Sequence, residues 1–359
     1  MARELDTIDR RILDLVQAEV PLVPRPFAVL AERAGVDEQE IIRRICALKE
    51  APRVIRQISA IFDSNALGYR SSLVAARIDP SRLDEAAGIV SRHPGVSHNY
   101  RREHDFNLWY TVAVPPDSRL GLERTIDELH RQSGAISTRL LPTLTRYKIG
   151  VRLDLSGENT STPKKLWGSE DSAPASQGVE LTEADKSIVR IAQADLPIVE
   201  RPFDVWADEA GCPVEELLKA IRRFEQAGQM RRFSAVLRHR EAGFSANGMG
   251  TWVVPKGRED QFGATAATFP EVSHCYLRPT YPDWPYNVFT MVHAQSNSAC
   301  EAVLARISEA TGVKDFACLY STHEYKKVRV KYFTPEIPAW ESAVLGTAST
   351  PRQLAPSAS

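Results

Sequence analysis

The sequence predicts an α+β protein formed by tandem duplication, in which each half has a winged helix-turn-helix followed by a βαββαβ sheet domain. Three observations lead to this fold class. The second half of the chain repeats the first in order, each half begins with helical periodicity, and each half continues with alternating strand and helix patterns. A chain of 359 residues is long enough to hold two such halves.

The duplication shows as short blocks that recur at a constant distance along the chain. The segment Leu5–Leu13 is similar to Leu181–Val189, which lies 176 positions further on. Three blocks recur at the same distance: Arg25-Pro26-Phe27 as Arg201-Pro202-Phe203, Ala34-Gly35 as Ala210-Gly211, and Val96-Ser97-His98 as Val272-Ser273-His274. Tyr147-Lys148 recurs as Tyr325-Lys326 after small insertions. Chance identities would not keep this order over about 150 residues, so the halves are predicted to share one fold.

The first part of each half has the periodicity of short helices. In the first half, apolar residues recur on one face of three successive segments: Ile8, Ile12, Leu15 and Val16, then Phe27, Leu30 and Ala31, then Ile41, Ile45 and Leu48. Gly35 stands between the second and third segments, where a helix-turn-helix needs its turn. This part is therefore predicted to be a helix-turn-helix domain.

The second part of each half changes to strand-like composition. In the first half the expected order is strand, helix, strand, strand, helix, strand, over residues 70–79, 83–91, 97–104, 106–115, 120–132 and 136–149. This is the order of a ferredoxin-like sheet with its helices on one face. The second half repeats it from Phe244 to Lys327.

These patterns divide the chain into six segments. Residues 1–62 and 179–238 are predicted to be the helix-turn-helix domains, and residues 63–155 and 239–334 the ferredoxin-like domains. Residues 156–178 are rich in Ser, Pro, Gly, Thr and Lys without apolar periodicity, and are expected to be a flexible linker. Residues 335–359 are again rich in Ala, Ser, Thr and Pro, and are expected to be a disordered tail.

Charge and composition narrow the class of protein. The formal net charge is -1 and the isoelectric point is about 6.7, whereas nucleic-acid-binding domains often exceed roughly 9. No apolar stretch approaches the roughly 20 residues of a membrane helix, and the charged segment Ala2–Asp6 lacks the features of a secretory signal. A cytoplasmic protein without membrane contact is therefore expected. The five cysteines are scattered, with no spacing typical of a metal site or a disulfide framework.

A polar row recurs in the strand-like segments of both halves. Because side chains alternate across a strand, His98, Tyr100, Arg102 and His104 are predicted to share one face, and His274, Tyr276 and Arg278 repeat the first three in phase. Such a row must face solvent, a partner sheet or a polar ligand, because burying it unpaired would be costly. A wet sheet face and a polar interface between the halves remain open alternatives.

The repeated pattern resembles two related families. Leu5-Asp6-x-x-Asp9-x-x-Ile12-Leu13, followed by a helix-turn-helix and then βαββαβ, resembles the Lrp/AsnC transcription regulators. The segments Ser97–Thr111 and Ser273–Phe289 resemble the signatures of the two subunit types of siroheme decarboxylase, here joined in one chain. The resemblance implies decarboxylation of the C12 and C18 acetate side chains of siroheme, giving 12,18-didecarboxysiroheme on the way to haem d1 or, by the alternative route, haem b.

The residues of the polar rows suit a tetrapyrrole substrate. A flat apolar ring with many carboxylates and an iron needs cations, aromatic faces and imidazoles, so siroheme itself is expected to be the only tetrapyrrole group, with no separate cofactor. The catalytic candidates are His98, His104, His274 and Tyr100. The substrate-binding candidates are Arg101, Arg102, Asn107, Trp109, Tyr276, Arg278, Trp284, Asn287, His323 and Lys326. No metal site is expected beyond an axial histidine to the tetrapyrrole iron, and which histidine donates a proton stays open.

Two alternative functions and the state of assembly also follow from the sequence. A DNA-binding regulator is disfavoured because the candidate recognition helices begin with the acidic segments Asp37–Glu40 and Val214–Glu216, although Arg43, Arg44, Arg222 and Arg223 keep it open. A haem-binding sensor without catalysis cannot be separated from an enzyme by sequence. The two halves are predicted to pair as an intramolecular pseudo-dimer through the sheet faces opposite their helices, and further homo-oligomerisation is left open.

Overall fold

The computed structural model describes residues 5–50, 54–149, 181–237 and 246–348. These residues form two compact units. The helical unit contains residues 5–50, 54–70, 181–237 and 331–335, and the sheet unit contains residues 71–149, 246–330 and 336–348. Each unit therefore draws on both halves of the chain. The linker predicted at 156–178 lies outside the described residues.

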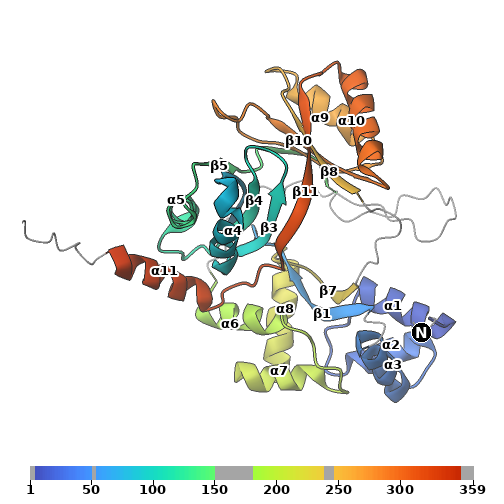
Figure 1. Cartoon of the computed structure of the whole chain (residues 1–359). Helices are drawn as coiled ribbons and strands as arrows, with labels where there is room; N and C mark the ends of the chain where they lie inside the picture. The colour runs from blue at the N-terminus through green and yellow to red at the C-terminus, as the bar shows by residue number, and fades with distance from the viewer. Residues whose placement is uncertain (1–4, 51–53, 150–180, 238–245, 349–359) are drawn as a thin grey trace, which may run out of the picture. The chain divides into compact units, whose positions relative to one another are not determined.

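The helical unit holds two three-helix domains and one strand pair (Figure 1). The first domain consists of α1 (Thr7–Ala18), α2 (Pro26–Ala34) and α3 (Glu38–Glu50), and the second of α6 (Glu183–Ala192), α7 (Pro202–Ala210) and α8 (Val214–Gln226). The strands that follow them, β1 (Ile55–Phe62) and β7 (Met230–Leu237), pair antiparallel with each other. The two helix-turn-helix domains thus form a pseudo-dimer of their own.

The blocks repeated between the halves are helix start and stop signals. Pro26 and Pro202 occupy the first turn of α2 and α7, where a missing N–H costs nothing. Gly35 and Gly211 end the same helices with φ of 76° and 66°, a left-handed conformation that glycine adopts without a Cβ penalty. The shared sequence therefore encodes the same turn in both domains.

The sheet unit contains the predicted βαββαβ order twice. The first copy consists of β2 (Arg70–Arg77), α4 (Leu83–Arg92), β3 (Val96–Arg102), β4 (Leu108–Val114), α5 (Gly121–Ser133) and β5 (Ser137–Leu141), followed by β6 (Thr145–Ile149). The second consists of β8 (Ala246–Trp252), α9 (Glu259–Ala267), β9 (Val272–Leu277), β10 (Val288–Ala294), α10 (Asn297–Thr311) and β11 (Phe316–Lys327). The α+β fold class predicted from the sequence is confirmed.

The two copies exchange their last strands. The strand order is β5-β2-β4-β3-β11-β8-β10-β9-β6. The first part of β11, Phe316–Tyr320, pairs with β8 of its own copy, whereas the part from Ser321 to Lys327 pairs with β3 of the other copy. Conversely, β5 pairs with β2, and β6 continues the chain to pair with β9. Each copy therefore completes the sheet of the other.

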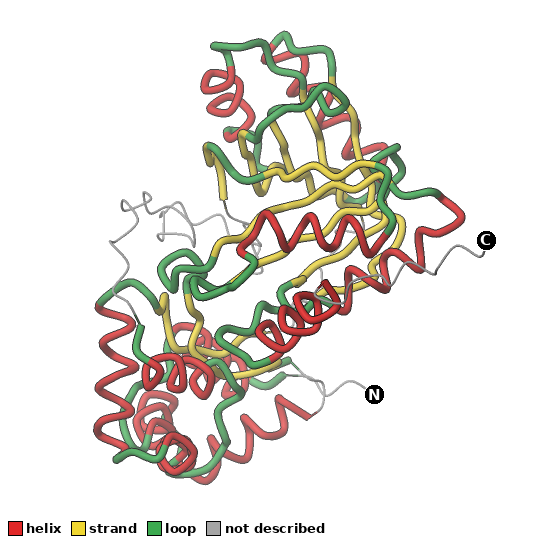
Figure 2. Tube along the Cα trace, turned by 90° about the vertical axis from the view of Figure 1, so that its left-hand side faces the viewer, coloured by secondary structure: helices red, strands yellow, loops and turns green. Residues whose placement is uncertain are grey.

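Three apolar cores hold the sheet unit together. One lies between the first copy and its helices α4 and α5, and a second between the second copy and α9 and α10. The third, which we call the shared core, consists of Ala75, Phe106, Trp109, Leu141, Met249, Trp284, Phe289 and Leu319. Its residues alternate with helix-facing ones, so they lie on the opposite sheet face. Because residues of both copies pack together on that face, the predicted pseudo-dimer is confirmed. Figure 2 shows helices, in red, in front of the strands, in yellow.

Several sequence-based boundaries differ from the structure. The predicted strand 97–104 ends at Arg102, and the single strand predicted at 136–149 is two, because Pro142 interrupts the ladder between β5 and β6. Residues 63–70 and 331–335 belong to the helical unit rather than to the ferredoxin-like domains. The tail predicted to be disordered from 335 begins with α11 (Glu336–Ala348).

Helix α11 is ordered because it packs against the first copy. The Glu341 carboxylate accepts hydrogen bonds from the Ser118 hydroxyl and the backbone N–H groups of Arg119 and Leu120. These donors lie at the start of α5, where N–H groups have no partner within the helix. The Trp340 ring meets the His93 ring edge-on, with 4.4 Å between centroids. Ala and Ser composition could not reveal these contacts.

No helix among the described residues is both long and apolar enough to cross a membrane. The same residues contain no group of three or more His, Cys, Asp or Glu side chains placed to hold a metal ion.

We predict that His93 makes stability depend on acid pH. Burial, reinforced by the Lys326 charge, lowers the pKa of His93 to about 3, so the folded protein keeps it neutral while the unfolded chain protonates near pH 6.5. The contribution of neutral His93 to the free energy of unfolding is fully present above pH 6.5. It is lost as the pH falls toward 3, by about 1.4 kcal/mol per pH unit. His93→Phe, which copies Phe269 of the other half, should flatten this slope in urea unfolding measured from pH 6.5 to 4.5.

His323→Phe, at an exposed position, is the control and should keep the wild-type slope. An unchanged slope in His93→Phe would show that another group is responsible.

Candidate functional site

The first polar row lies where β3 meets the exchanged part of β11. Asn99 faces the helices, because its amide donates to the Ala87 carbonyl and the Ser91 hydroxyl on α4. The alternate residues of β3 therefore face the other way. Across the strand pair, Tyr100 lies opposite Glu324 and His98 opposite Lys327. We call His98, Tyr100, Arg102, Glu324 and Lys327 the first site.

The second row lies at the equivalent position, where β9 meets β6. His274, Tyr276 and Arg278 of β9 repeat the pattern, and Arg146 of β6 lies opposite Tyr276. We call these four residues the second site. Each site thus combines a row from one half with an exchanged strand from the other. The strand exchange therefore gives two clusters rather than one, each built from both halves.

Arg102 and Arg278 occupy equivalent positions as the last residues of the two rows. Each guanidinium lies over an aromatic ring of the shared core, Arg102 at 5.8 Å from the Trp109 centroid and Arg278 at 5.3 Å from that of Phe289. Arg102 donates to the Leu319 carbonyl at 2.8 Å, and Arg278 donates to the Leu141 carbonyl.

The charges of these two arginines are only partly compensated. Within the described parts of the chain, neither pairs with a carboxylate, and the buried Nε–H of each has no acceptor. Burial lowers the pKa of both to about 10. Because a desolvated cation without an anion is costly, the arrangement favours an anionic ligand.

The histidines of the two rows are held alike. The ring Nδ1 of His98 lies 2.9 Å from the Ser97 hydroxyl, and that of His274 lies 2.8 Å from the Ser273 hydroxyl. Burial lowers the pKa of both imidazoles. At His98 the Glu324 carboxylate opposes this shift and Lys327 adds to it, whereas at His274 the neighbouring His293 adds to it. The two histidines therefore differ in electrostatics more than in geometry.

The tyrosines of the two rows also differ in the charges that surround them. Burial, together with the Glu324 carboxylate, raises the pKa of Tyr100 to about 12. Burial also raises the pKa of Tyr276, but there Arg278 and Arg146 act against the shift. Both phenols are therefore neutral at physiological pH, with Tyr100 beside an anion and Tyr276 between cations.

His104 lies beyond the end of β3 and so does not belong to the row on the strand, contrary to the prediction. Its Nδ1 accepts a hydrogen bond from the Phe106 backbone N–H at 3.0 Å, within the turn between β3 and β4. The ring lies 5.3 Å from that of Trp284 and 6.4 Å from that of Tyr286. Burial lowers the pKa of His104, with Asp105 opposing the shift. Trp284 and Tyr286 of the second half thus pack against His104 of the first.

Several predicted substrate-binding residues have structural contacts instead. The Asn107 amide accepts from the backbone N–H of Ile78 and donates to its carbonyl. The Asn287 amide makes the same two hydrogen bonds with Val254. Lys326 donates to the carbonyls of Ser91 and His93 at the end of α4. These three side chains are therefore committed to the fold.

The remaining candidates lie in two other environments. Trp109 and Trp284 are buried in the shared core, and the Trp109 indole donates to the Phe106 carbonyl at 2.6 Å. The Trp284 Nε1–H has no acceptor among the described residues. Arg101 and His323 are exposed and lie opposite each other on β3 and β11. The structure does not bring these four together with the polar rows into one cavity.

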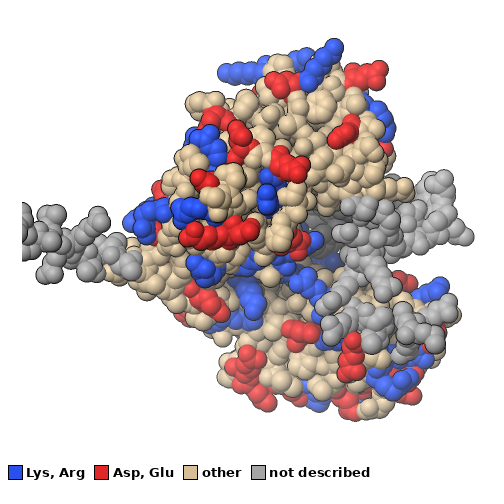
Figure 3. All heavy atoms as spheres, viewed as in Figure 1, with Lys and Arg blue, Asp and Glu red and all other residues tan. Residues whose placement is uncertain are grey.

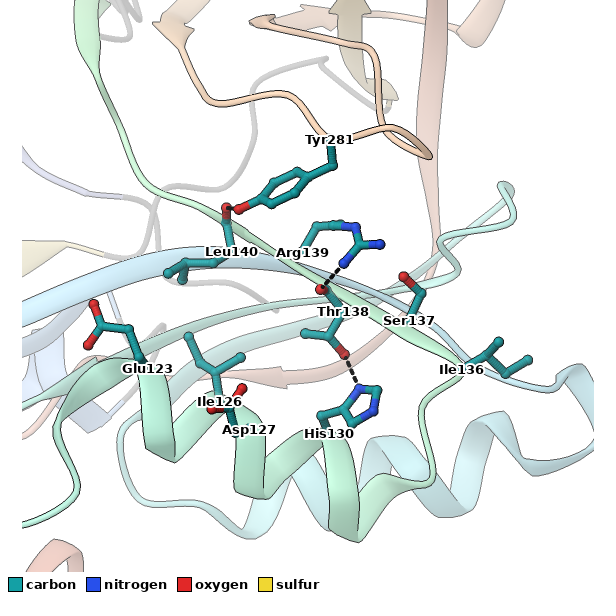
Figure 4. A pocket seen from close by; sticks show the side chains of 10 residues that line it. All are labelled: Glu123, Ile126, Asp127, His130, Ile136, Ser137, Thr138, Arg139, Leu140 and Tyr281. Carbon is teal, nitrogen blue, oxygen red and sulfur yellow. Dashed lines mark hydrogen bonds between the residues drawn. The ribbon is translucent and has the colours of Figure 1, made fainter.

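A pocket of about 410 Å³ lies elsewhere, between α5, β5 and Tyr281 of the second half (Figure 4). Its basic groups already have partners. Arg139 pairs with Asp283 at 2.6 Å and lies over the Tyr281 ring, and His130 bonds the Thr138 hydroxyl at 2.9 Å. The pocket therefore lacks the partly uncompensated guanidinium groups of the two rows.

Sequence reasoning missed Glu324, Lys327 and Arg146. Their place opposite the rows depends on strand exchange, which a pattern read one segment at a time does not show. A signal was present, however: Glu324 and Arg146 directly precede the repeated Tyr-Lys pairs, so they are equivalent residues of opposite charge.

Two helix-turn-helix domains and two ferredoxin-like domains that exchange strands define a fused pair of AsnC-type subunits. The AsnC-like ligand binding domain matches residues 66–148 and 241–326, and the siroheme decarboxylase NirDL-like HTH domain matches residues 9–56 and 185–231. The chain is 39% identical over 342 residues to the siroheme decarboxylase of Hydrogenobacter thermophilus, covering 95% of this chain and 98% of that one. The chain therefore belongs to the siroheme decarboxylase family.

Two further relatives fit this assignment. A crystal structure of the siroheme decarboxylase NirDL with an iron-uroporphyrin III analogue superposes with a TM-score of 0.77 at 36% identity, covering 96% of this chain and 100% of that one. The siroheme decarboxylase beta subunit of Methanosarcina barkeri is 42% identical over 151 residues, covering 42% of this chain and 99% of its own. A separate subunit thus corresponds to part of this fused chain.

The arginines that kept DNA binding open are engaged within the helical unit. On α3, Arg44 pairs with Asp6, Asp9 and Glu40, and Arg43 pairs with Glu40. On α8, the guanidinium groups of Arg222 and Arg223 bond the Leu22 carbonyl and the Asp185 carboxylate. Figure 3 shows acidic and basic side chains interspersed over this face of the molecule. These four arginines therefore already have partners within the protein.

We predict that the protein does not bind DNA specifically at physiological salt. The acidic starts of α3 and α8 would repel phosphates, and the basic residues behind them are paired. Titration of a labelled fragment of its own promoter in roughly 150 mM salt should show only weak binding that varies little with sequence. Nanomolar binding to one footprinted site would contradict this.

Proposed function

We propose that this chain removes the carboxyl groups of the C12 and C18 acetates of siroheme, giving 12,18-didecarboxysiroheme, and that the polar rows bind the substrate. The observation that carries the proposal is the pair of partly uncompensated guanidinium groups, Arg102 and Arg278, each over an aromatic ring and each in line with a tyrosine and a histidine. A flat polycarboxylate ring offers what these groups lack: carboxylates for the cations and an apolar surface for the aromatics.

The chemistry needs few protein groups. When an acetate attached to the conjugated ring loses carbon dioxide, the electron pair of the broken C–C bond can delocalise into the macrocycle. A proton must then reach the remaining carbon to give a methyl group. His98, Tyr100, His104 and His274 are the candidate donors, and the arginines would hold the other carboxylates so that one acetate is placed for reaction.

The names of the relatives support this assignment over a sensor without catalysis. The siroheme decarboxylase of Hydrogenobacter thermophilus matches 95% of the chain, and one solved relative is a complex with an iron-uroporphyrin III analogue. We infer that siroheme is the substrate, that no separate cofactor is needed, and that the fused arrangement belongs to the haem d1 route. Anaerobic incubation of the pure protein with siroheme, followed by mass spectrometry, tests the activity directly, because a sensor would return siroheme unchanged.

We predict that Arg102→Ala and Arg278→Ala weaken tetrapyrrole binding. Each variant loses a charge-assisted contact of about 1.5–3 kcal/mol, which corresponds to roughly a tenfold to hundredfold higher Kd. An absorption titration with iron uroporphyrin III measures this, alongside the melting temperature, because both arginines also bond a strand carbonyl. Arg139→Ala, at the pocket of Figure 4, is the control. If all three variants had the same Kd, the rows would not be the binding surface.

The histidines are predicted to act on turnover. Replacing the proton donor by Ala should lower the single-turnover rate by about 10²-fold or more while tetrapyrrole binding stays largely intact. His98→Ala, His104→Ala and His274→Ala are compared, with absorption spectra to reveal any loss of an axial ligand to iron. Wild-type rates in all three would show that the catalytic assignment is wrong.

A further inference from the structure

The two sites are alike in backbone and in structural contacts. Tyr325 bonds Asp84 and Lys326 bonds the His93 carbonyl on α4, while Tyr147 bonds Asp260 and Lys148 bonds the Phe269 carbonyl on or beside α9. The residue just before each Tyr-Lys pair lies opposite the tyrosine of the row. The equivalence of Glu324 and Arg146 therefore rests on matched contacts on both sides, and their opposite charge is a real difference between the sites.

We propose that the two sites have diverged in function: the first carries out the reaction, with Glu324 as the residue that positions its proton donors, and the second binds tetrapyrrole carboxylates without turnover. This inference rests on the proposed function and assigns its steps to one of two similar sites. The division between the sites is based on the register of β11 against β3 and of β6 against β9. It sets a carboxylate opposite Tyr100 and beside the position of His98, and a guanidinium opposite Tyr276.

At the first site, Glu324 suits proton transfer. The Glu324 carboxylate lies opposite Tyr100, where it can accept from the phenol and fix its orientation, and it opposes the lowering of the His98 pKa that burial and Lys327 cause. Lys327, whose Nζ lies 3.8 Å from the Glu324 carboxylate, offsets the negative charge that would otherwise repel the substrate. Together with Arg102, the site keeps a positive balance. It can therefore hold an acetate and still deliver a proton.

At the second site, the same position favours binding and disfavours proton donation. Arg146 and Arg278 place two cations around Tyr276, and His293 shares the Ser273 hydroxyl with His274. Burial and His293 lower the pKa of His274, and the register sets Arg146 opposite this row where the first site has Glu324, so the carboxylate that counters the shift at His98 has no equivalent here. Two guanidinium groups are, however, well suited to carboxylates.

The step assigned to the first site is balanced. The bond between the acetate methylene carbon and its carboxyl carbon breaks, carbon dioxide leaves, and the electron pair enters the macrocycle. A proton from His98 or Tyr100 then forms the new C–H bond, and the donor regains its proton from water. No oxidant or reductant is consumed, and Glu324 exchanges no atom with the substrate.

The test compares single-turnover decarboxylation of siroheme with equilibrium binding of iron uroporphyrin III. Glu324→Gln keeps the shape of the side chain and removes its charge. We expect a rate at least tenfold lower with an analogue Kd that is unchanged or lower, and Glu324→Asp should recover part of the rate. Glu103→Gln, at an exposed carboxylate in the turn after β3, should react like the wild type. This split between rate and binding is one that a general loss of structure would not produce.

The number of tetrapyrrole molecules bound per chain tests whether the second site binds without turnover. Wild-type protein should bind two iron uroporphyrin III molecules per chain, and Arg146→Gln should weaken one of the two sites about tenfold, which corresponds to a contact of about 1.4 kcal/mol. Wild-type rates in Glu324→Gln, or a single binding site per chain, would overturn the division between the sites. If the wild-type protein leaves siroheme unchanged, the proposed function itself fails, which is a separate outcome.

Discussion

The exchange of the last strands is the constraint on which the sheet unit depends. Because β11 leaves β8 to pair with β3, and the chain of β5 continues into β6 to pair with β9, backbone hydrogen bonds join the two halves along two seams. An unpaired strand edge would be costly and prone to aggregation, so each half needs the other to close its sheet. The shared core then fills the space between the two sheets. Both polar rows lie along these seams, so the same hydrogen bonds that make the pseudo-dimer also build the sites.

The two buried arginines link the seams to the chemistry. Leu319 precedes the part of β11 that crosses over, and Leu141 precedes the turn into β6; the carbonyl of each accepts from Arg102 or Arg278. Part of each guanidinium therefore holds the crossing strand in place while the Nε–H remains without an acceptor among the described residues. A residue with both tasks explains why these cations are tolerated without a carboxylate partner. The cost of their burial is met in part by aromatic rings and carbonyls.

Sequence alone predicted the architecture well because duplication tests every element twice. Helix signals such as Pro26 and Gly35, and the alternation of His98, Asn99 and Tyr100, are local and were read correctly. The sequence did not reveal features that depend on distant contacts. The amide of Asn107 bonds Ile78 after β2, and α11 is held by Glu341, which accepts from the segment just before α5. Glu324 could not be placed beside Tyr100 without the register of β11 against the other half.

Fusion of the halves removes a restriction that symmetry imposes on identical subunits. In a homodimer with a two-fold axis, any residue that is good for catalysis at one site appears at the other, whatever its effect there. Here the contacts that hold the sheets are the same in both halves, as Tyr147 and Tyr325 show, whereas Arg146 and Glu324 next to them differ in charge. Binding many carboxylates and delivering a proton make opposite demands on local charge, because cations that favour the first suppress the acid needed for the second. A duplicated chain can satisfy each demand at a different seam without altering the fold that both seams share.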